Sequence, residues 1–238
     1  MVMKHSFRNS KVSYSRSVIA YMTIGWLLFV VLWTLLLVKF ISQLIQFPQQ
    51  YYFYALLPFV LIGAALLSDL VSGLIHFAAD TFFSIKTPII GPTVIYWFRE
   101  HHFDPLWMTR HSFILQTGDA GWLGVPILII AFFCQPHYQT LTAQIMVGFT
   151  LSATFIMFLT NRIHSWAHVK NPPRIVVKLQ KYRIILPPAM HAAHHAPPHK
   201  NNYCITLGIL NPFLDYIGFF TRIEKWVRKM QRHSSQNS

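Results

Sequence analysis

The stretch SVIAYMTIGWLLFVVLWTLLLV, residues 17–38, is a continuous apolar segment without one charged side chain. About 20 such residues, at 1.5 Å rise per residue, carry a helix across roughly 30 Å of hydrocarbon. Basic residues precede the segment, as in a cleaved signal peptide, but KFISQLIQF (39–47) after it offers no small-residue cleavage site. The segment therefore predicts a retained first membrane helix.

Three further apolar segments predict the same class of fold. The second covers residues 51–67 and continues through Asp69 towards His76. The third, short and roughly at 121–133, and the fourth lie within residues 120–161, which contain no Lys, Arg, Asp or Glu and break at CQPHYQ (134–139). Hydrophobic residues make up 53% of the 238 and charged residues 11%, which is unusual for a soluble protein. We predict an all-α, multi-pass membrane helical bundle with about four transmembrane helices.

The positions of the 20 Lys and Arg residues predict how this bundle is oriented. Cytosolic loops close to a membrane are enriched in these residues. If the N-terminus lies in the cytosol, the outer connections SQLIQFPQQ (42–50) and CQPHYQT (134–140) contain none of them, and only Lys39 falls near an outer helix end. Both termini and the loop after the second helix are then cytosolic.

The net charge of +13 is also compatible with nucleic-acid binding. A basic surface beside anionic headgroups accounts for it without nucleic acid, at about 1 kcal/mol per basic residue. We therefore expect membrane lipids, and no nucleic acid, as partners. Cys134 and Cys204 fall on opposite sides of the predicted topology, which argues against a disulfide or a thiolate metal site.

Two segments are expected to lie at the membrane surface. Residues 85–105 are partly apolar but are interrupted by Pro88, Gly91 and Pro92, which suits an interfacial or re-entrant segment. Residues 203–220 predict apolar turns, and TRIEKWVRKMQR (221–232) predicts a basic amphipathic helix. We divide the chain into a cytosolic N-terminal tail (1–16), a membrane domain (17–225) and a basic C-terminal tail (226–238).

Ten of the 13 histidines fall in the predicted cytosolic segments. The second helix ends in SGLIHFAAD (72–80) and the fourth in NRIHSWAH (161–168), so His76 with Asp80, and His164 with His168, are spaced i, i+4. Residues at this spacing project from one face of a helix. The two pairs are expected to converge if both helices continue past the hydrocarbon.

The loops that follow these two helices carry most of the other histidines. REHHFDP (99–105) and MHAAHHAPPH (190–199) supply His101, His102, His191, His194, His195 and His199. Imidazole ligates zinc, copper, iron and nickel, and one zinc needs only three or four ligands. Eight or nine histidines therefore predict two metal ions, each with four or five nitrogens. Three roles stay open for His111, in MTRHSF (108–113): a metal ligand, a residue that orients a ligand, or a structural histidine.

Two alternatives compete with a paired metal site. A single histidine in a helix is usually a packed or surface residue, but the joint spacing argues against this for the whole set. Histidine tracts of metal transporters tend to be loose and repetitive, and a transporter needs ionisable residues in the membrane core, where Asp69 is the main candidate. No HExxH or Cys-rich zinc motif is present. A redox metal site on the cytosolic face is favoured.

The same motifs resemble those of the CarF/Kua lipid desaturase family, which includes plasmanylethanolamine desaturase. The resemblance runs through SGLIHFAADT (72–81), FREHHFDPLWMTRHSF (98–113), the Gly-Asp at 118–119, NRIHSWAH (161–168) and ILPPAMHAAHHAPPHKNNYCITLGILNPFLDYIGFF (185–220). It covers roughly residues 60–225. Met190 departs from the pattern, because a second histidine is expected before His191 in animal members.

The resemblance implies an oxidoreductase with two iron ions, O2 as co-substrate and electrons from an external donor. The family's histidine motifs fall on ten positions, which are the expected metal ligands: His76, His101, His102, His111, His164, His168, His191, His194, His195 and His199. All of these except His111 and His199, together with Asp80, form the expected catalytic set. Three roles stay open for Asp80: direct ligation of the metal, a water-mediated contact with it, and orientation of a ligand histidine. The last two are favoured.

The resemblance also implies a lipid substrate, first of all plasmanylethanolamine, whose alkyl ether would become the vinyl ether of a plasmalogen. A fatty-acyl desaturase or hydroxylase acting on an ester phospholipid, and a non-enzymatic metal-binding membrane protein, are the alternatives. Arg99, Arg110 and Lys200 flank the histidine motifs and are candidates for binding a headgroup phosphate, although topology alone would also place them there. No flavin or nicotinamide motif is present, so a small cytochrome or ferredoxin is expected to supply electrons.

Overall fold

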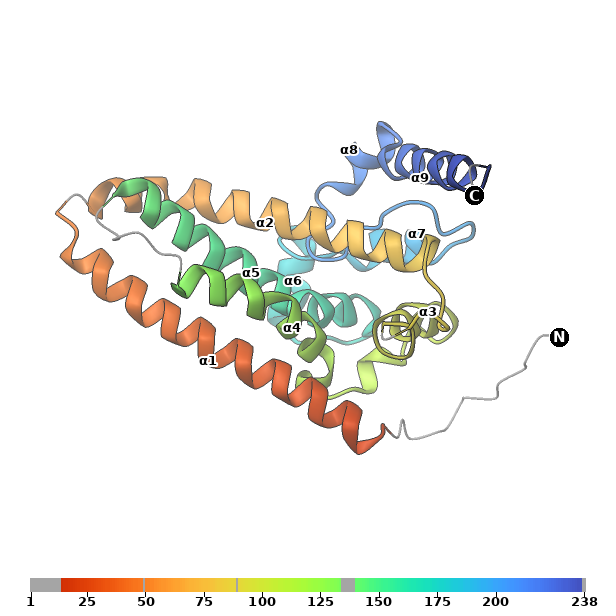
Figure 1. Ribbon diagram of the computed structural model, residues 1–238, viewed down its shortest axis with the longest axis horizontal. Helices are drawn as coiled ribbons and strands as arrows, with labels where there is room; N and C mark the ends of the chain where they lie inside the picture. Colours follow the sequence, from red (N-terminus) through yellow and green to blue (C-terminus); the bar gives the residue numbers. More distant parts are fainter. Residues whose placement is uncertain (1–13, 49, 89, 134–139, 237–238) are drawn as a thin grey trace.

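The computed structural model describes residues 14–48, 50–88, 90–133 and 140–236, and these ranges contain helices and turns but no β-strand. Four long helices form the body of the molecule (Figure 1): α1 (Arg16–Gln46), α2 (Gln50–Thr81), α4 (Phe113–Phe133) and α5 (Leu141–His168). Each is long and apolar enough to cross a membrane. The all-α class and the expected four membrane helices are confirmed.

The long helices alternate in direction, so the C-terminal ends of α2 and α5 reach the same end of the bundle (Figure 1). Helix α5 contacts each of the other three, and α1 also packs along α4. Phe29 of α1 and Phe158 of α5 stack with ring centroids 4.2 Å apart in the shared apolar core. The bundle thus brings the two predicted ligand-bearing helix ends together.

Helices α1 and α4 approach closely through glycines. A Cβ atom on Gly121 would lie 2.7 Å from the carbonyl oxygen of Gly25, and a side chain on Gly118 would collide with the backbone of Met22. Small residues allow this kind of backbone contact between membrane helices. The contact fixes α4 against α1.

Two helices are longer than the sequence predicted. Helix α1 continues past residue 38 to Gln46, and α4 begins at Phe113 instead of near residue 121. The early turns of α4 contain Gln116 and Asp119, which hydrogen-bond within the protein to Ser165 and Asn161. Polar residues paired in this way join a membrane helix without contact with lipid.

The shorter helices gather at the end of the bundle that carries the histidines (Figure 1). Between α2 and α4 lie a π-helical turn (Gly91–Ile95), α3 (Tyr96–Phe103) and a 3-10 turn (Met108–Arg110), and after α5 come α6 (Arg174–Lys181), α7 (Pro188–His194), α8 (Asn211–Tyr216) and α9 (Phe219–Gln236). The described residues of the 85–105 segment form no membrane-crossing helix, and 221–232 is helical as expected. The proposed boundary at 225/226 falls inside α9, and the division into domains stays a prediction.

Asp69 fastens the segment before α8 to the middle of α2. Its carboxylate is fully buried and accepts hydrogen bonds from the backbone N–H groups of Leu207 (2.8 Å), Gly208 (2.9 Å) and Leu210 (3.1 Å). Ser72, one turn further along, accepts the N–H of Ile205 at 3.1 Å. These bonds give Asp69 a structural role, which weakens the transporter alternative that depended on it.

Candidate metal centre

Nine ligand-type side chains converge from four elements at the end of the bundle. The end of α2 supplies His76 and Asp80, α3 supplies His101 and His102, the end of α5 supplies His164 and His168, and α7 with the residue after it supplies His191, His194 and His195. Five of these histidines are at most 2% exposed: His76, His101, His164, His191 and His194. A polar cluster this deeply buried requires a partner for its nitrogen atoms.

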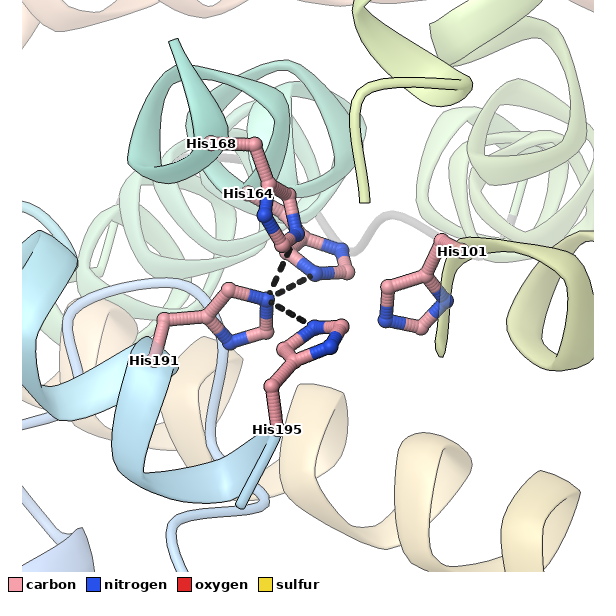
Figure 2. Close-up of side chains that lie close together, drawn as sticks. All are labelled: His101, His164, His168, His191 and His195. Carbon is pink, nitrogen blue, oxygen red and sulfur yellow. Dashed lines mark hydrogen bonds between the residues drawn. The ribbon is translucent and has the colours of Figure 1, made fainter. Parts of the chain in front are cut away.

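The first group, which we call site 1, contains His101, His164, His168, His191 and His195, shown in Figure 2. One ligand atom from each lies within 4.8 Å of all the others. The Nε2 atom of His191 is 2.7 Å from Nε2 of His164, 2.8 Å from that of His168 and 3.0 Å from that of His195. One imidazole nitrogen has a single proton or a single lone pair, so it cannot satisfy three such neighbours by hydrogen bonds alone.

The second group, site 2, contains His76, His102, His194 and Asp80. Oδ2 of Asp80 lies 3.2 Å from Nε2 of His102, 3.4 Å from Nε2 of His76 and 3.5 Å from Nε2 of His194. The two sites adjoin, because the rings of His101 and His102 are 4.5 Å apart. Three imidazoles and one carboxylate form a donor set that suits a divalent transition metal.

The unpaired atoms of the two sites test whether a metal ion fits. Six buried side-chain atoms here have no hydrogen-bond partner among the described residues: His76 Nε2, Asp80 Oδ1, His101 Nε2, His102 Nδ1, His191 Nδ1 and His194 Nε2. Buried polar atoms left unpaired are costly, and metal coordination would satisfy those that face the centre of a group. The residues therefore fit two metal ions, one at each site.

Backbone carbonyls orient several of the rings. His76 donates from Nδ1 to the carbonyl oxygen of Tyr203 (3.2 Å), His101 to that of Trp97 (3.3 Å), and His194 to that of Asn201 (2.7 Å). A proton on Nδ1 leaves the Nε2 lone pair free, as is usual for metal-bound histidine. Sequence reasoning missed this use of Asn201 and Tyr203, because a backbone carbonyl has no residue signature.

Burial keeps the imidazoles of His101, His191 and His195 neutral. It lowers the pKa of His101 and of His191 well below the ordinary value, and neighbouring histidines lower both further. Burial and the same kind of neighbour lower the pKa of His195 to about 3. Neutral imidazole is the form that binds a metal, so these three side chains can ligate at physiological pH without first losing a proton.

The structure places two predicted ligands outside both groups. His199 lies next to site 2, with its ring 5.0 Å from that of His102, and donates from Nδ1 to the carbonyl of His194 at 3.1 Å. His111 is buried away from the other histidines against Trp97 and Trp107, and its Nε2 is hydrogen-bonded to the hydroxyl of Tyr14. Direct ligation by His111 or His199 stays a prediction without support from this geometry.

The three basic candidates for headgroup binding have partners within the protein. Arg99 donates to the carbonyl oxygens of Asp80 and Phe83, both at 2.9 Å, at the C-terminal end of α2. Arg110 pairs with Asp104 at 2.9 Å, and Lys200 lies 4.0 Å from Glu224. Arg99 thus caps the C-terminal end of α2, the helix that carries His76. A role for any of the three in headgroup binding stays a prediction.

An apolar cavity of about 390 Å³ lies beside the centre, between α1, α2, the π-helical turn, α4 and α5. A smaller cavity of about 20 Å³ reaches His101 and His164. Phe98, Asp119 and Asn161 line both cavities. A hydrocarbon chain in the larger cavity would therefore lie next to site 1.

The fold and this site together define a class of protein: a bundle of membrane-type helices with two adjoining histidine groups that could bind metal ions. The lipid desaturase domain family matches residues 65–238, and this chain belongs to that family. The family resemblance predicted from the histidine motifs is confirmed.

Individual relatives agree with the family assignment. The chain is 38% identical over 178 residues to plasmanylethanolamine desaturase 1 of Mus musculus, covering 72% of this chain and 66% of that protein. It is 36% identical over 178 residues to plasmanylethanolamine desaturase of Myxococcus xanthus (72% and 60%) and 34% identical over 162 residues to chloroplastic fatty acid desaturase 4 of Arabidopsis thaliana (67% and 48%). The chain thus spans between about half and two thirds of these relatives. No solved structure matches it.

Proposed function

We propose that this protein is an oxygen-dependent, di-iron membrane lipid desaturase that converts plasmanylethanolamine to the vinyl ether plasmalogen. The observation that carries the proposal is the convergence of eight histidines and Asp80 into two adjoining groups at the end of an apolar helical bundle. Two of the relatives named above are plasmanylethanolamine desaturases, which supports the ether lipid as substrate.

The nature of the reaction favours a redox metal. Removal of hydrogen from an unactivated methylene is beyond any side-chain acid or base, and iron, when bound, supplies the oxidising chemistry with O2. Imidazole and carboxylate ligands suit iron, and zinc with the same ligands has no redox chemistry. In the overall reaction, two neighbouring carbons each lose one hydrogen, and O2 with two external electrons and two protons becomes two water molecules.

The chain itself supplies binding, orientation and a dry environment. The rings of His76, His101 and His194 are held by the carbonyls described above, and Asp80 contributes negative charge beside three imidazoles. We assign the catalytic set to His76, Asp80, His101, His102, His164, His168, His191, His194 and His195. The large apolar cavity shares Phe98, Asp119 and Asn161 with the small cavity at His101 and His164, and it would hold the hydrocarbon chain away from water.

We further propose that the termini and both metal sites face the cytosol, because all the described Lys and Arg residues except Lys39 lie in the helices and loops at this end of the bundle. A polar headgroup would then stay at the aqueous surface while its chain enters the cavity. Electrons would come from a small cytochrome or ferredoxin type protein. A fatty-acyl desaturase acting on an ester phospholipid is the second candidate, and the likeness to fatty acid desaturase 4 of Arabidopsis thaliana favours it.

The lipid profile of cells that lack and then express this protein tests the proposal. We expect acid-labile vinyl ethers to appear with the unchanged chain and to be absent with His164→Ala or His195→Ala. His233→Ala, an exposed histidine near the end of α9, is the matched control and should leave the product unchanged. If an unsaturated acyl lipid appears without any vinyl ether, the substrate is an ester phospholipid and not the ether lipid. A change in metal uptake with no change in any lipid would refute the enzyme proposal.

A further inference from the structure

Helix α6 presents a row of basic side chains to the outside of the molecule. Arg174, Lys178 and Lys181 are spaced i, i+4 and i+7, so they lie along one ridge of the helix, and all three are exposed. The opposite face is buried through Val176 and Gln180, which are 2% and 6% exposed. The ridge therefore points directly away from the protein core.

No acidic side chain in the described structure neutralises this ridge. None of the ion pairs found there includes any of the three residues. The sequence contains no Asp or Glu between Asp119 and Asp215. The positive charge of the ridge is thus available to a partner, and it attracts negatively charged surfaces over about one Debye length, roughly 8–10 Å at physiological ionic strength.

Helix α6 is joined directly to the elements that carry site 1. It follows α5, which ends at His168, and precedes α7, which carries His191. Val176 packs with Ile163 in one apolar cluster, and Gln180 donates to the carbonyl oxygen of Trp166 at 3.3 Å. Trp166 stands between His164 and His168 in the sequence, so a protein bound on the ridge would sit over the helix end that holds two site 1 ligands.

We propose that the Arg174, Lys178 and Lys181 ridge docks a small acidic one-electron carrier, of haem or iron–sulfur type. The inference rests on the proposed desaturase function, because that reaction needs two electrons from outside the chain. Charge complementarity of this kind accelerates association and fixes orientation more than it adds affinity. The ridge provides the positive side of such a complementary pair. Because α6 packs against α5, a carrier bound to the ridge would lie on the side of site 1.

An anionic membrane surface is a poorer match to this helix. Interfacial helices keep a continuous apolar face for the bilayer. The apolar face of α6 is used against the protein, and the exposed Ile175 and Val177 lie on opposite flanks of the ridge. Helix α9 differs, because Trp226 and Met230 are exposed at i, i+4 beside its basic residues, as an interfacial helix requires.

Charge reversal at the ridge tests the proposal. The variant Arg174→Glu/Lys178→Glu/Lys181→Glu is compared with Arg222→Glu/Lys225→Glu/Lys229→Glu, which makes the same charge change on exposed positions of α9. The iron-loaded protein is placed in nanodiscs of phosphatidylcholine, and its association with the soluble haem domain of a cytochrome b5, an acidic carrier, is measured by stopped flow. We expect the α6 variant to lower the association rate constant by about tenfold or more at low salt, the α9 variant to leave it within about twofold, and added salt to slow the unchanged protein.

Several results would overturn the docking proposal. One is an equal loss of association rate in the α6 and α9 variants, and another is no loss in the α6 variant. A third is an α6 variant that no longer binds anionic vesicles but still associates with the carrier at the unchanged rate. Reduction by dithionite bypasses the carrier, so the α6 variant should then still form the lipid product at the rate of the unchanged protein. If the unchanged protein forms no product with dithionite, the desaturase proposal fails, and the binding result still decides whether α6 docks the carrier.

Discussion

The Nε2 atoms of His164 and His191 lie 2.7 Å apart, although the two residues belong to different helices, α5 and α7. Burial and neighbouring imidazoles keep His191 neutral by lowering its pKa. Two further Nε2 atoms, from His168 and His195, lie within 3.0 Å of the same His191 nitrogen. A cation at the centre of these nitrogens would satisfy all of them together, which is the basis of the metal assignments.

The two groups predict how many metal ions each variant keeps. We expect about two iron ions per chain in the unchanged protein and about one in His164→Ala, which loses a site 1 ligand, or in His76→Ala, which loses a site 2 ligand. His111→Ala and His199→Ala should keep both, because neither side chain lies in a group. Elemental analysis of purified protein measures the ratio. Loss of iron in the His111 variant would show that the ligand set is assigned incorrectly.

Replacing Asp80 by Asn should weaken metal binding at site 2 alone. The change keeps the shape of the side chain but removes the charge that lies 3.2 Å from His102 and 3.4 Å from His76. A residue that ligates the metal or orients a ligand histidine typically changes metal affinity by about 10–100-fold. Competition with a chelator measures the affinity of each site. Equal affinities in Asp80→Asn and the unchanged protein would argue against any metal-linked role for Asp80.

The metal-free protein should lose stability as the pH falls below about 6.5, the ordinary pKa of histidine. In the folded state the pKa of His101 and of His191 is far lower, so between those values the unfolded chain binds more protons. Stability is therefore full above pH 6.5 and declines in acid, by up to about 1.4 kcal/mol per pH unit for each buried imidazole. Unfolding of chelator-treated protein in detergent at pH 7.5 and 5.5 measures the difference, and a stability that does not change with pH would contradict it.

Helical spacing is the reason that much of this site could be predicted from sequence. The pairs His76 with Asp80 and His164 with His168 lie on single helices, so a period of 3.6 residues places each pair on one face. The division into two groups was beyond prediction, because His76 shares a site with His102 and His194, while His164 at the end of α5 belongs to the other site. That division depends on how α3 and α7 pack across the helix ends, and these long-range contacts have no local signal.

The boundaries of the helices show the same limit. Hydropathy located the apolar parts of α1 and α4 but not the extra turns at 39–46 and 113–120, where polar residues of α4 are paired within the protein. Asp69 was placed correctly in a membrane helix, yet its role depends on a segment more than a hundred residues later, around Gly208. A single sequence does not show such a contact.

Removing the Asp69 carboxylate should destabilise the fold without any direct effect on the metal ligands. Asp69→Ala removes the acceptor of one buried N–H group, that of Gly208, and of two part-buried ones, those of Leu207 and Leu210. An unpaired buried group costs about 1–3 kcal/mol and a part-buried one less, so we expect a total loss of about 3 kcal/mol. Asp104→Ala, which removes a partly exposed partner of Arg110, should cost about 1 kcal/mol or less and is the control. Denaturant unfolding in detergent measures both. Equal costs would mean that Asp69 does not anchor the segment before α8.

A single-turnover reaction tests the desaturase proposal most directly. The iron-loaded protein is reduced with dithionite in nanodiscs that contain plasmanylethanolamine, O2 is added, and acid-labile vinyl ether is measured, with zinc-loaded protein and His164→Ala as controls. We predict vinyl ether from the iron-loaded protein and none from either control. No unsaturated lipid from protein that holds both irons, or equal product from the zinc-loaded protein, would contradict the proposal.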